Sequence, residues 1–166
     1  MINGEKILRA MYPNLNDNQY QPAGIDLRLG KINKIVNDKG ICAIVDGFKQ
    51  LPKQVELEES AAKVGSTKLE IGYTLEPHIP YIAVVDKSIK INKDSAQIYL
   101  PRSSLLRAGV DVRTALGDPG FNGHLSFLII NHNEVPFFIK KGERFAQMID
   151  IKVDGVIDEY DGDYNE

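Results

Sequence analysis

A chain of 166 residues with 43% hydrophobic and 26% charged residues has the size and composition of one globular domain. A formal net charge of −3 gives no general attraction for nucleic acid, so we expect no nucleic-acid partner and only a local site for any anion. The single cysteine, Cys42, excludes an internal disulfide and the usual zinc-ligand spacings. No signal peptide pattern and no apolar run of roughly 18 residues is visible, so we expect a cytoplasmic protein without a membrane partner.

The first predicted element is a short amphipathic helix over residues 4–11. The segment is rich in good helix formers, and Ile7, Leu8 and Met11 fall on one face. Pro13 follows closely, and we expect the helix to end near it.

A strand is predicted over residues 21–30, after a polar loop. Three apolar residues alternate there with two charged ones: Ile25, Leu27 and Leu29 with Asp26 and Arg28. A period of two indicates a strand with one buried face. The pattern alone leaves open whether Asp26 and Arg28 form a solvated face or belong to a site.

The interval from residue 31 to residue 69 gives weaker signals. Residues 41–45 are a strand candidate, whereas residues 54–63 are charged and mixed and are predicted to form a loop or a frayed turn. No partner base is identifiable for Cys42, so we expect a small buried residue and not a nucleophile.

Short strand candidates recur from Leu69 onward, separated by turn-forming residues. They cover residues 69–75, 81–85, 88–91, 96–100, 124–131, 137–139 and 144–151. Many short strands, with helical patterns only at the start and near residues 103–108, indicate an all-β sandwich or barrel. We predict a single domain over residues 1–153 and an acidic, mobile tail over residues 154–166, which contain no lysine or arginine.

The segment from Arg102 to Arg107 has the features of a phosphate receptor. Its two arginines flank a predicted helical turn, which Ser103 or Ser104 would cap and Gly109 would end. Backbone N–H groups at a helix start, adjacent hydroxyls and a guanidinium group are good ligands for phosphate oxygens.

A tight reversal over residues 117–123 follows, and it carries one carboxylate, Asp118, and one aromatic ring, Phe121. A phosphate receptor followed closely by a lone acid and a ring suggests a site for a phosphorylated, planar ligand, which we interpret as a nucleotide. Structural or surface roles are expected for the three histidines, which lack the spacing of metal ligands: His78, His124 and His132.

Four sequence blocks occur in order along the chain: QPAGIDLRLG, PRSSLLRAGV, TALGDPGFNG and KKGERFAQMI. Together they resemble the blocks of the dCTP deaminase/dUTPase superfamily, and most closely its archaeal-type dUTPase branch. The resemblance covers residues 2–11, 19–30 and 70–151. It implies a distorted β-barrel or jelly-roll (β-clip) subunit and a homotrimer whose active sites are shared between neighbouring subunits.

The resemblance assigns substrate binding to the first half of the candidate site. Arg102, Ser103 and Ser104 match the phosphate-binding block of the family, and Arg107 matches a second arginine that faces the phosphates. These assignments agree with the chemistry that the segment offers on its own.

The remaining matches concern catalysis, the sugar and the framework of the site. Asp118 matches the aspartate that orients or deprotonates the attacking water, and Phe121 matches the aromatic position under the sugar, where a flat ring bars a 2′-hydroxyl. Gln147 matches the glutamine of the last block. Asp26 matches an acid that helps to hold either the hydration shell of the metal or the framework of the site.

The reaction that the resemblance implies is the hydrolysis of dUTP to dUMP and pyrophosphate by attack of water at the α-phosphate. Arginines, hydroxyls and backbone N–H groups would neutralise part of the triphosphate charge. Mg²⁺, held mainly by the triphosphate and water, would neutralise the rest. Uracil would be recognised largely by main-chain groups of residues 110–118.

One departure from the family concerns the alternative reaction, deamination of dCTP. In the deaminating members a glutamate stands ten residues after the aspartate that Asp118 matches, and it moves protons at the cytosine ring. Leu128 occupies that position here, and its neighbours on the same face of the predicted strand, Ser126 and Ile130, are not carboxylates. The sequence therefore disfavours a dCTP deaminase unless another acid enters the site.

A second departure concerns the end of the chain, where family members close over the triphosphate with an arm containing basic residues or glutamine. Residues 160–164 echo that arm only faintly, because acids stand where a cation would help. The tail and the unassigned residues 31–69 keep an alternative open, in which a nucleotide-binding regulatory or partner-binding protein has the same fold and weak turnover.

Overall fold

Antiparallel strands make up most of the structure, a computed structural model that describes residues 1–65, 68–156 and 158–165. In chain order the elements are α1 (Glu5–Met11), η1 (Asp17–Gln19), β1 (Tyr20–Gln21), β2 (Gly24–Val36), β3 (Ala43–Val45), β4 (Phe48–Gln50), β5 (Lys53–Glu56), β6 (Ser60–Val64), β7 (Lys68–Leu75), β8 (Pro80–Val85), β9 (Ile89–Lys90), β10 (Ser95–Pro101), α2 (Ser103–Arg107), β11 (Val110–Arg113), β12 (Asn122–Gly123), β13 (Ser126–Asn131), β14 (Phe137–Ile139) and β15 (Arg144–Lys152). Both predicted helices are present, and the all-β prediction is confirmed. In the described part of the chain, no helix is long and apolar enough to cross a membrane.

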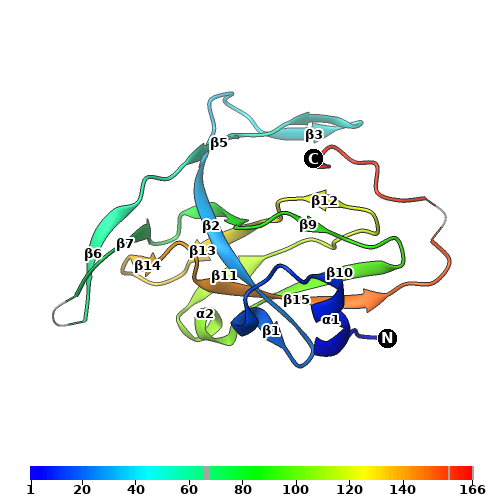
Figure 1. The fold of residues 1–166 in the computed structure, drawn as a ribbon. Coiled ribbons are helices and arrows are strands. Elements are labelled where there is room, and N and C mark those ends of the chain that lie inside the picture. The colour runs from blue at the N-terminus through cyan, green and yellow to red at the C-terminus, as the bar shows by residue number, and fades with distance from the viewer. Residues whose placement is uncertain (66–67, 157, 166) are drawn as a thin grey trace.

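The long strand β2 organises the main sheet and crosses the whole molecule (Figure 1). Its first half pairs with β15 and its second half pairs with β8. The register with β8 shifts at Gly30, where a Cβ atom would stand only 2.8 Å from the Cα atom of Asp86. Only a residue without a side chain permits this close approach, and β2 changes its direction and its partner there.

The main sheet curls into a nearly closed barrel in the order β10-β15-β2-β8-β13-β11. The chain beyond β11 returns to β10, because the backbones of Gly117 and Gln97 form a bridge with two hydrogen bonds of 2.8 and 2.9 Å. Apolar side chains from all these strands fill the interior, and the largest of them include Ile25, Leu27, Leu29, Ile129, Phe145 and Met148. Strand β10 is therefore held on one side by β15 and on the other by Gly117, and two candidate site residues, Arg102 and Asp118, lie next to it.

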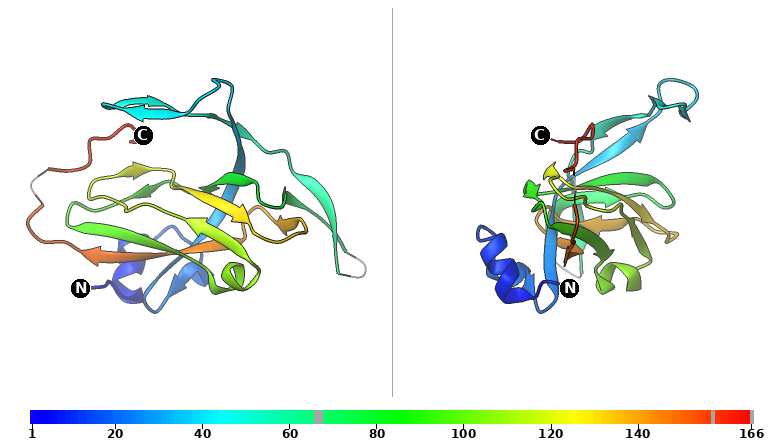
Figure 2. Two further views of the ribbon diagram at one scale, coloured as in Figure 1. Left: turned by 180° about the vertical axis from the view of Figure 1, so that it is seen from behind. Right: turned by 90° about the vertical axis from the view of Figure 1, so that its right-hand side faces the viewer.

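Two projections leave the barrel, one formed by β3 and β4 and the other by β6 and β7 (Figure 2). Their outer residues include several exposed apolar side chains: Ile41, Ile44, Phe48, Leu69 and Ile71. Cys42 lies at the base of the first projection and is exposed, so the prediction of a buried cysteine is wrong. The local sequence is apolar, but the hairpin stands away from the barrel and has no core to enter.

The sequence prediction was also wrong for residues 54–63, where the structure has most of β5 and β6 instead of a loop. Both strands are almost entirely exposed, and their charged side chains carry no alternation of buried and exposed positions. Strand β11 was missed for a different reason: its buried Val110 and Val112 do alternate with Asp111 and Arg113, but it has only four residues and closely follows α2.

Candidate active site

The phosphate-binding block lies where β10 ends and α2 begins. Arg102 is the N-cap of α2, and its backbone N–H donates to the carbonyl of Phe145 on β15. No side chain caps the helix, so the prediction that Ser103 or Ser104 caps it is wrong; both are exposed residues of its first turn. Buried Leu105 anchors the helix to the barrel.

The helix ends as predicted at a glycine. Gly109 has a φ of +71°, a left-handed conformation that suits glycine, and it follows the last turn directly. Arg107 is in that last turn and is exposed to solvent. The two arginines of the block therefore lie at opposite ends of α2, and both serines follow Arg102 directly.

Asp26 is the centre of a charged cluster, and the possibility that it belongs to a solvated strand face is wrong. Its side chain is only 5% exposed, because β2 is paired with β15 at this point and the side chains of Arg102 and Arg144 lie against the carboxylate. Its Oδ2 atom lies 3.2 Å from Nε of Arg102 and 3.1 Å from Nη1 of Arg144. Burial raises the pKa of the Asp26 carboxyl, and the two guanidinium groups act against this shift.

These contacts give Asp26 a framework role. One carboxylate oxygen orients two guanidinium groups from different elements, and Arg102 also reaches the carbonyl of Arg144 at 3.5 Å. On the neighbouring strand Gln147 pairs in register with Asp26, and its side chain packs over Gly24. Of the two roles implied for Asp26, the geometry favours the framework over the hydration shell of a metal.

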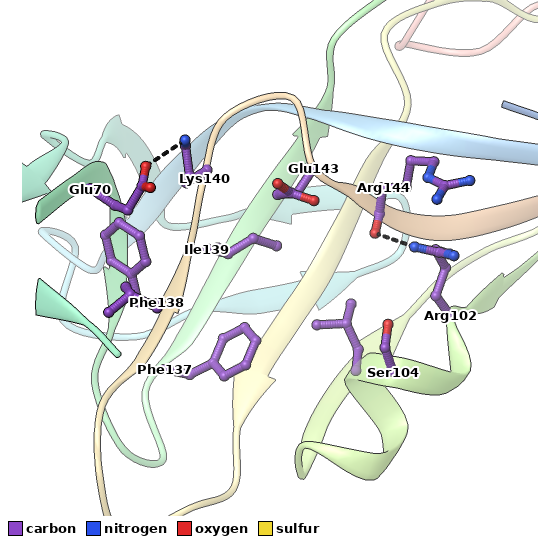
Figure 3. Close-up of a pocket in the computed structure, with 11 residues that line it drawn as sticks. Glu70, Arg102, Ser104, Phe137, Phe138, Ile139, Lys140, Glu143 and Arg144 are labelled. Carbon is purple, nitrogen blue, oxygen red and sulfur yellow. Dashed lines mark hydrogen bonds and ion pairs between the residues drawn. The ribbon is translucent and has the colours of Figure 1, made fainter. Parts of the chain in front are cut away.

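A first pocket of about 340 Å³ opens beside this cluster (Figure 3). Arg102, Arg144 and Ser104 lie on one side of it, and Glu70 and Lys140 lie on the opposite side and form an ion pair at 2.6 Å. Cations and a hydroxyl on one wall of an open pocket are suited to bind phosphate oxygens.

Asp118 and Phe121 lie in a second pocket of about 470 Å³. The wall consists mainly of apolar and aromatic residues, among them Tyr99, Leu125 and Phe127. Asp118 is half-buried, and within the described residues it is the only carboxylate that lines this pocket. A largely apolar pocket with one carboxylate suits a nucleoside beside a positioned water.

The two pockets lie at different points along β10. Gln97, in the first half of the strand, pairs with Gly117, next to Asp118, whereas Arg102 directly follows the end of the strand. From Gln97 to Arg102 the chain covers about 16 Å at roughly 3.3 Å per residue. One subunit thus separates the phosphate-binding cations from the carboxylate.

The acidic tail lies against the second pocket. The N–H of Tyr160 donates to the carbonyl of Pro119 at 2.8 Å, and its ring contacts Phe121 edge-on with centroids 5.7 Å apart. Lysines of the same chain neutralise two tail acids: Lys93 lies 2.5 Å from Glu159 and Lys49 lies 2.7 Å from Asp163. Nothing in the sequence pattern indicated these lysines, because they lie more than 60 residues away in unassigned segments or turns.

Leu128 lies on β13 between Ile82 of β8 and Arg113 of β11. Ser126, on the same face, lines the second pocket together with His124, for which a structural or surface role was expected. No acid replaces the missing glutamate among the described residues that line the pocket. The described residues also contain no group of three His, Cys, Asp or Glu side chains that could hold a metal ion.

Comparisons with known proteins agree with this geometry. Residues 2–151 match the family described as dCTP deaminase-like. A probable deoxyuridine 5′-triphosphate nucleotidohydrolase from Methanopyrus kandleri is 40% identical over 165 residues, which are 99% of each chain. A protein of the same description from Methanothermobacter thermautotrophicus is 40% identical over 166 residues, which are 100% of each chain.

The fold also matches a solved structure. The crystal structure of 2′-deoxycytidine 5′-triphosphate deaminase from Agrobacterium tumefaciens superposes with a TM-score of 0.65 at 21% identity. The match covers 90% of the present chain and 48% of the deaminase chain, so the chain spans about half the length of that enzyme.

Proposed function

The chain belongs to the dCTP deaminase-like family, and on this basis we propose that it is a dUTP diphosphatase that hydrolyses dUTP to dUMP and pyrophosphate in the cytoplasm. The observation that carries the proposal is the second pocket, in which Asp118 is the only lining carboxylate of the described residues and stands among aromatic side chains. The relatives that match over their whole length are described as hydrolases of the same nucleotide.

In the proposed mechanism Asp118 orients a water molecule and accepts its proton. The water oxygen forms a bond to the α-phosphorus, the bond from that phosphorus to the bridging oxygen breaks, and pyrophosphate leaves. The ring of Phe121 lies under the deoxyribose and leaves no room for a 2′-hydroxyl. Main-chain groups of residues 110–118 read the uracil, a role supported by Ala115 and Leu116 in the pocket wall.

The triphosphate is bound by the other pocket. Arg102 and Ser104 line this pocket, Ser103 and Arg107 lie on the same helix, and we propose that these residues supply positive charge and hydrogen-bond donors. Gln147, on β15, pairs with Leu100, two residues before Arg102. The ion pair with Asp26 holds Arg102 in place, so that its guanidinium is oriented before the substrate binds.

We propose Mg²⁺ as the cofactor, held mainly by the triphosphate and water. The donor set fits this arrangement, because the described residues offer no cage of three metal ligands and Asp26 is engaged by two arginines. When bound, the cation neutralises phosphate charge that two arginines leave uncompensated. The residues that meet the metal-bound triphosphate are those of the phosphate-binding block.

We also propose a homotrimer with shared active sites. The separation of Arg102 and Asp118 along β10 supports it, because a neighbouring subunit can bring its own phosphate-binding block to the pocket of the first. A closed ring of identical heterologous interfaces places one such composite site at each interface.

Two other functions remain as alternatives. A nucleotide-binding regulatory protein with weak turnover is favoured by the tail, since Tyr160 stands against Phe121 in the pocket that the nucleoside would enter. A dCTP deaminase is disfavoured, because Leu128 cannot transfer a proton.

Release of pyrophosphate from dUTP, UTP, dTTP and dCTP, measured in parallel with Mg²⁺ and with EDTA, tests the proposal. We expect rapid release from dUTP alone and its loss with EDTA. If none of the four nucleotides released pyrophosphate in a protein that still binds dUTP, the result would favour the regulatory alternative. Ammonia released from dCTP would overturn the argument from Leu128.

A further inference from the structure

Tyr99 lies directly under the turn that carries Asp118. It is a residue of β10, only 3% exposed, and its ring packs 5.0 Å from that of Phe127 in the wall of the second pocket. A Cβ atom built on Gly117 would stand 2.3 Å from the Tyr99 hydroxyl oxygen. The hydroxyl therefore occupies the space in which a side chain at position 117 would lie, and the backbone next to Asp118 rests on it.

The same hydroxyl is bonded to the residue that pairs with Gly117. Tyr99 donates to Oε1 of Gln97 at 2.7 Å, and Gln97 exchanges both of its backbone hydrogen bonds with Gly117. Gln97 is completely buried. Tyr99 and Gln97 thus hold Gly117 from two directions, one through packing and one through the backbone.

The hydrogen bonds continue away from the pocket to the N-terminal helix. Nε2 of Gln97 donates to the hydroxyl of Tyr12 at 2.7 Å, and Tyr12, the C-cap of α1, donates to Oδ2 of Asp150 at 3.3 Å. Asn3 donates to the other oxygen of Asp150 at 2.6 Å. All donors in this chain point toward Asp150, a fully buried carboxylate whose hydrogen-bond partners here are neutral.

We propose that Tyr99 is a positioning residue for the hydrolysis of dUTP. The buried hydrogen-bond chain Tyr99–Gln97–Tyr12–Asp150 connects the turn that carries Asp118 to the N-terminal helix and holds that turn in place. The inference rests on the proposed function, since it assigns the base to Asp118. Tyr99 is not a catalytic residue, because its proton is committed to Gln97 and not to the pocket. Burial raises the pKa of the Tyr99 hydroxyl, which stays protonated at neutral pH.

The sharpest variant is Tyr99→Phe, which removes one oxygen and keeps the ring. Gln97 then loses its donor and Gly117 loses its support, so we expect kcat for dUTP to fall about ten- to a hundredfold. KM should stay within about twofold, because the phosphate-binding block is untouched and the variant keeps the ring at position 99 that lines the nucleoside pocket. Tyr81→Phe is the matched control: Tyr81 is 4% exposed, its hydroxyl accepts from the N–H of Glu76, and it lines neither pocket.

A second variant, Asp150→Asn, acts at the far end of the chain and touches no residue of the pocket. Asp150 accepts from Tyr12 and Gln97 at Oδ2 and from Asn3 at Oδ1, and the new amide keeps only one acceptor oxygen for these donors, so we expect kcat to fall about three- to tenfold. Because both changes break one chain, the double variant with Tyr99→Phe should lose little more than Tyr99→Phe alone.

Amide hydrogen exchange of the segment containing Gly117 tests the inference independently of the proposed function. It is measured in the wild type, Tyr99→Phe, Asp150→Asn and Tyr81→Phe. Faster exchange at this segment in Tyr99→Phe and Asp150→Asn than in the wild type and Tyr81→Phe is expected whether or not the protein hydrolyses dUTP. Unchanged exchange together with unchanged kcat would overturn the inference alone. A wild type without hydrolysis, but with the expected exchange pattern, would overturn the proposed function and leave the positioning role of Tyr99 standing.

Discussion

Asp118 shares its pocket with aromatic rings and with no other carboxylate of the described residues, so replacing one of its oxygens is a clean test of its role. Asp118→Asn keeps the shape and the hydrogen bonds of the turn but removes the proton acceptor. We expect dUTP hydrolysis to fall about 100- to 10,000-fold with dUTP affinity largely kept, as measured by pyrophosphate release and calorimetric titration.

Asp111→Asn is the control for this prediction. Asp111 lies on β11, where its carboxylate accepts a 2.8 Å hydrogen bond from Arg113, and it lines neither pocket. If Asp118→Asn and Asp111→Asn hydrolysed dUTP equally well, the base would have to be sought elsewhere.

A second prediction concerns the ring of Phe121 and the selection of the sugar. Phe121→Ala opens space beside the sugar, so a 2′-hydroxyl should become tolerated and the preference for dUTP over UTP, as a ratio of kcat/KM, should drop about tenfold or more. Phe137→Ala removes a ring of the same size from the first pocket and should leave the ratio unchanged. An undiminished preference in Phe121→Ala would place sugar selection on other groups.

At the scale of elements, the sequence predicted strands well where one face is buried and poorly where none is. The first half of β2 was predicted because Ile25, Leu27 and Leu29 recur with a period of two, and all three are buried. Strands β5 and β6 were missed because they are held by backbone pairing and not by burial of side chains. Such pairing leaves no periodic signal in the sequence.

The same distinction applies to the site. Arg102, Asp118 and Phe121 could be found because they lie in blocks that resemble a family, whereas Tyr99 has no such mark. The burial of Asp26 could not be deduced from alternation, because it depends on which strands flank β2. The position of the tail could not be deduced either, since its ion pairs join residues more than 60 positions apart.

The hairpin of β6 and β7 carries a prediction about pH. On β7, Glu70 forms ion pairs with Lys140 at 2.6 Å and with Lys68, and these hydrogen bonds, the one to Lys140 first, lower the pKa of Glu70 to about 2 from an ordinary 4.5. Because the pKa of Glu70 is lower in the folded state than in the unfolded state, ionised Glu70 stabilises the folded state above about pH 4.5. This contribution is lost as the pH falls from about 4.5 to 2. Glu70→Gln should therefore reduce the dependence of stability on pH between pH 2 and about pH 4.5.

Thermal unfolding midpoints of the wild type and Glu70→Gln between pH 2 and pH 6 check this prediction. Glu58→Gln, in the exposed loop before β6, serves as the control and should follow the wild type. A Glu70→Gln profile that paralleled the wild type throughout would mean that the ion pairs are too solvated to contribute.

At the scale of the whole molecule, the distance between the two pockets leads to a prediction about assembly. Arg102→Ala removes the phosphate-binding half of a site and Asp118→Asn removes the catalytic half. If sites are shared between subunits, mixing the two inactive variants under conditions of subunit exchange should restore activity, up to about one quarter of the wild type for random trimers. Pyrophosphate release after co-expression measures this.

A double variant carrying both changes in one chain is the control for the mixture. Mixed with the wild type, it can only dilute active sites, and it supplies neither missing half to either single variant. No recovery in a mixture that demonstrably exchanges subunits would mean that each site is built within one chain.

The pairing of the first and last parts of the chain has a consequence for synthesis on the ribosome. The N–H of Asn3 donates to the carbonyl of Asp150, Met1 accepts from Lys152, and β2 is paired along its first half only by β1 and β15. Residues 1–3 and the edge of β2 that pairs with β15 therefore have no partner until about residue 152 has emerged. A nascent chain must keep one edge of β2 unpaired until β15 has been synthesised, so the main sheet is completed only after that strand has emerged.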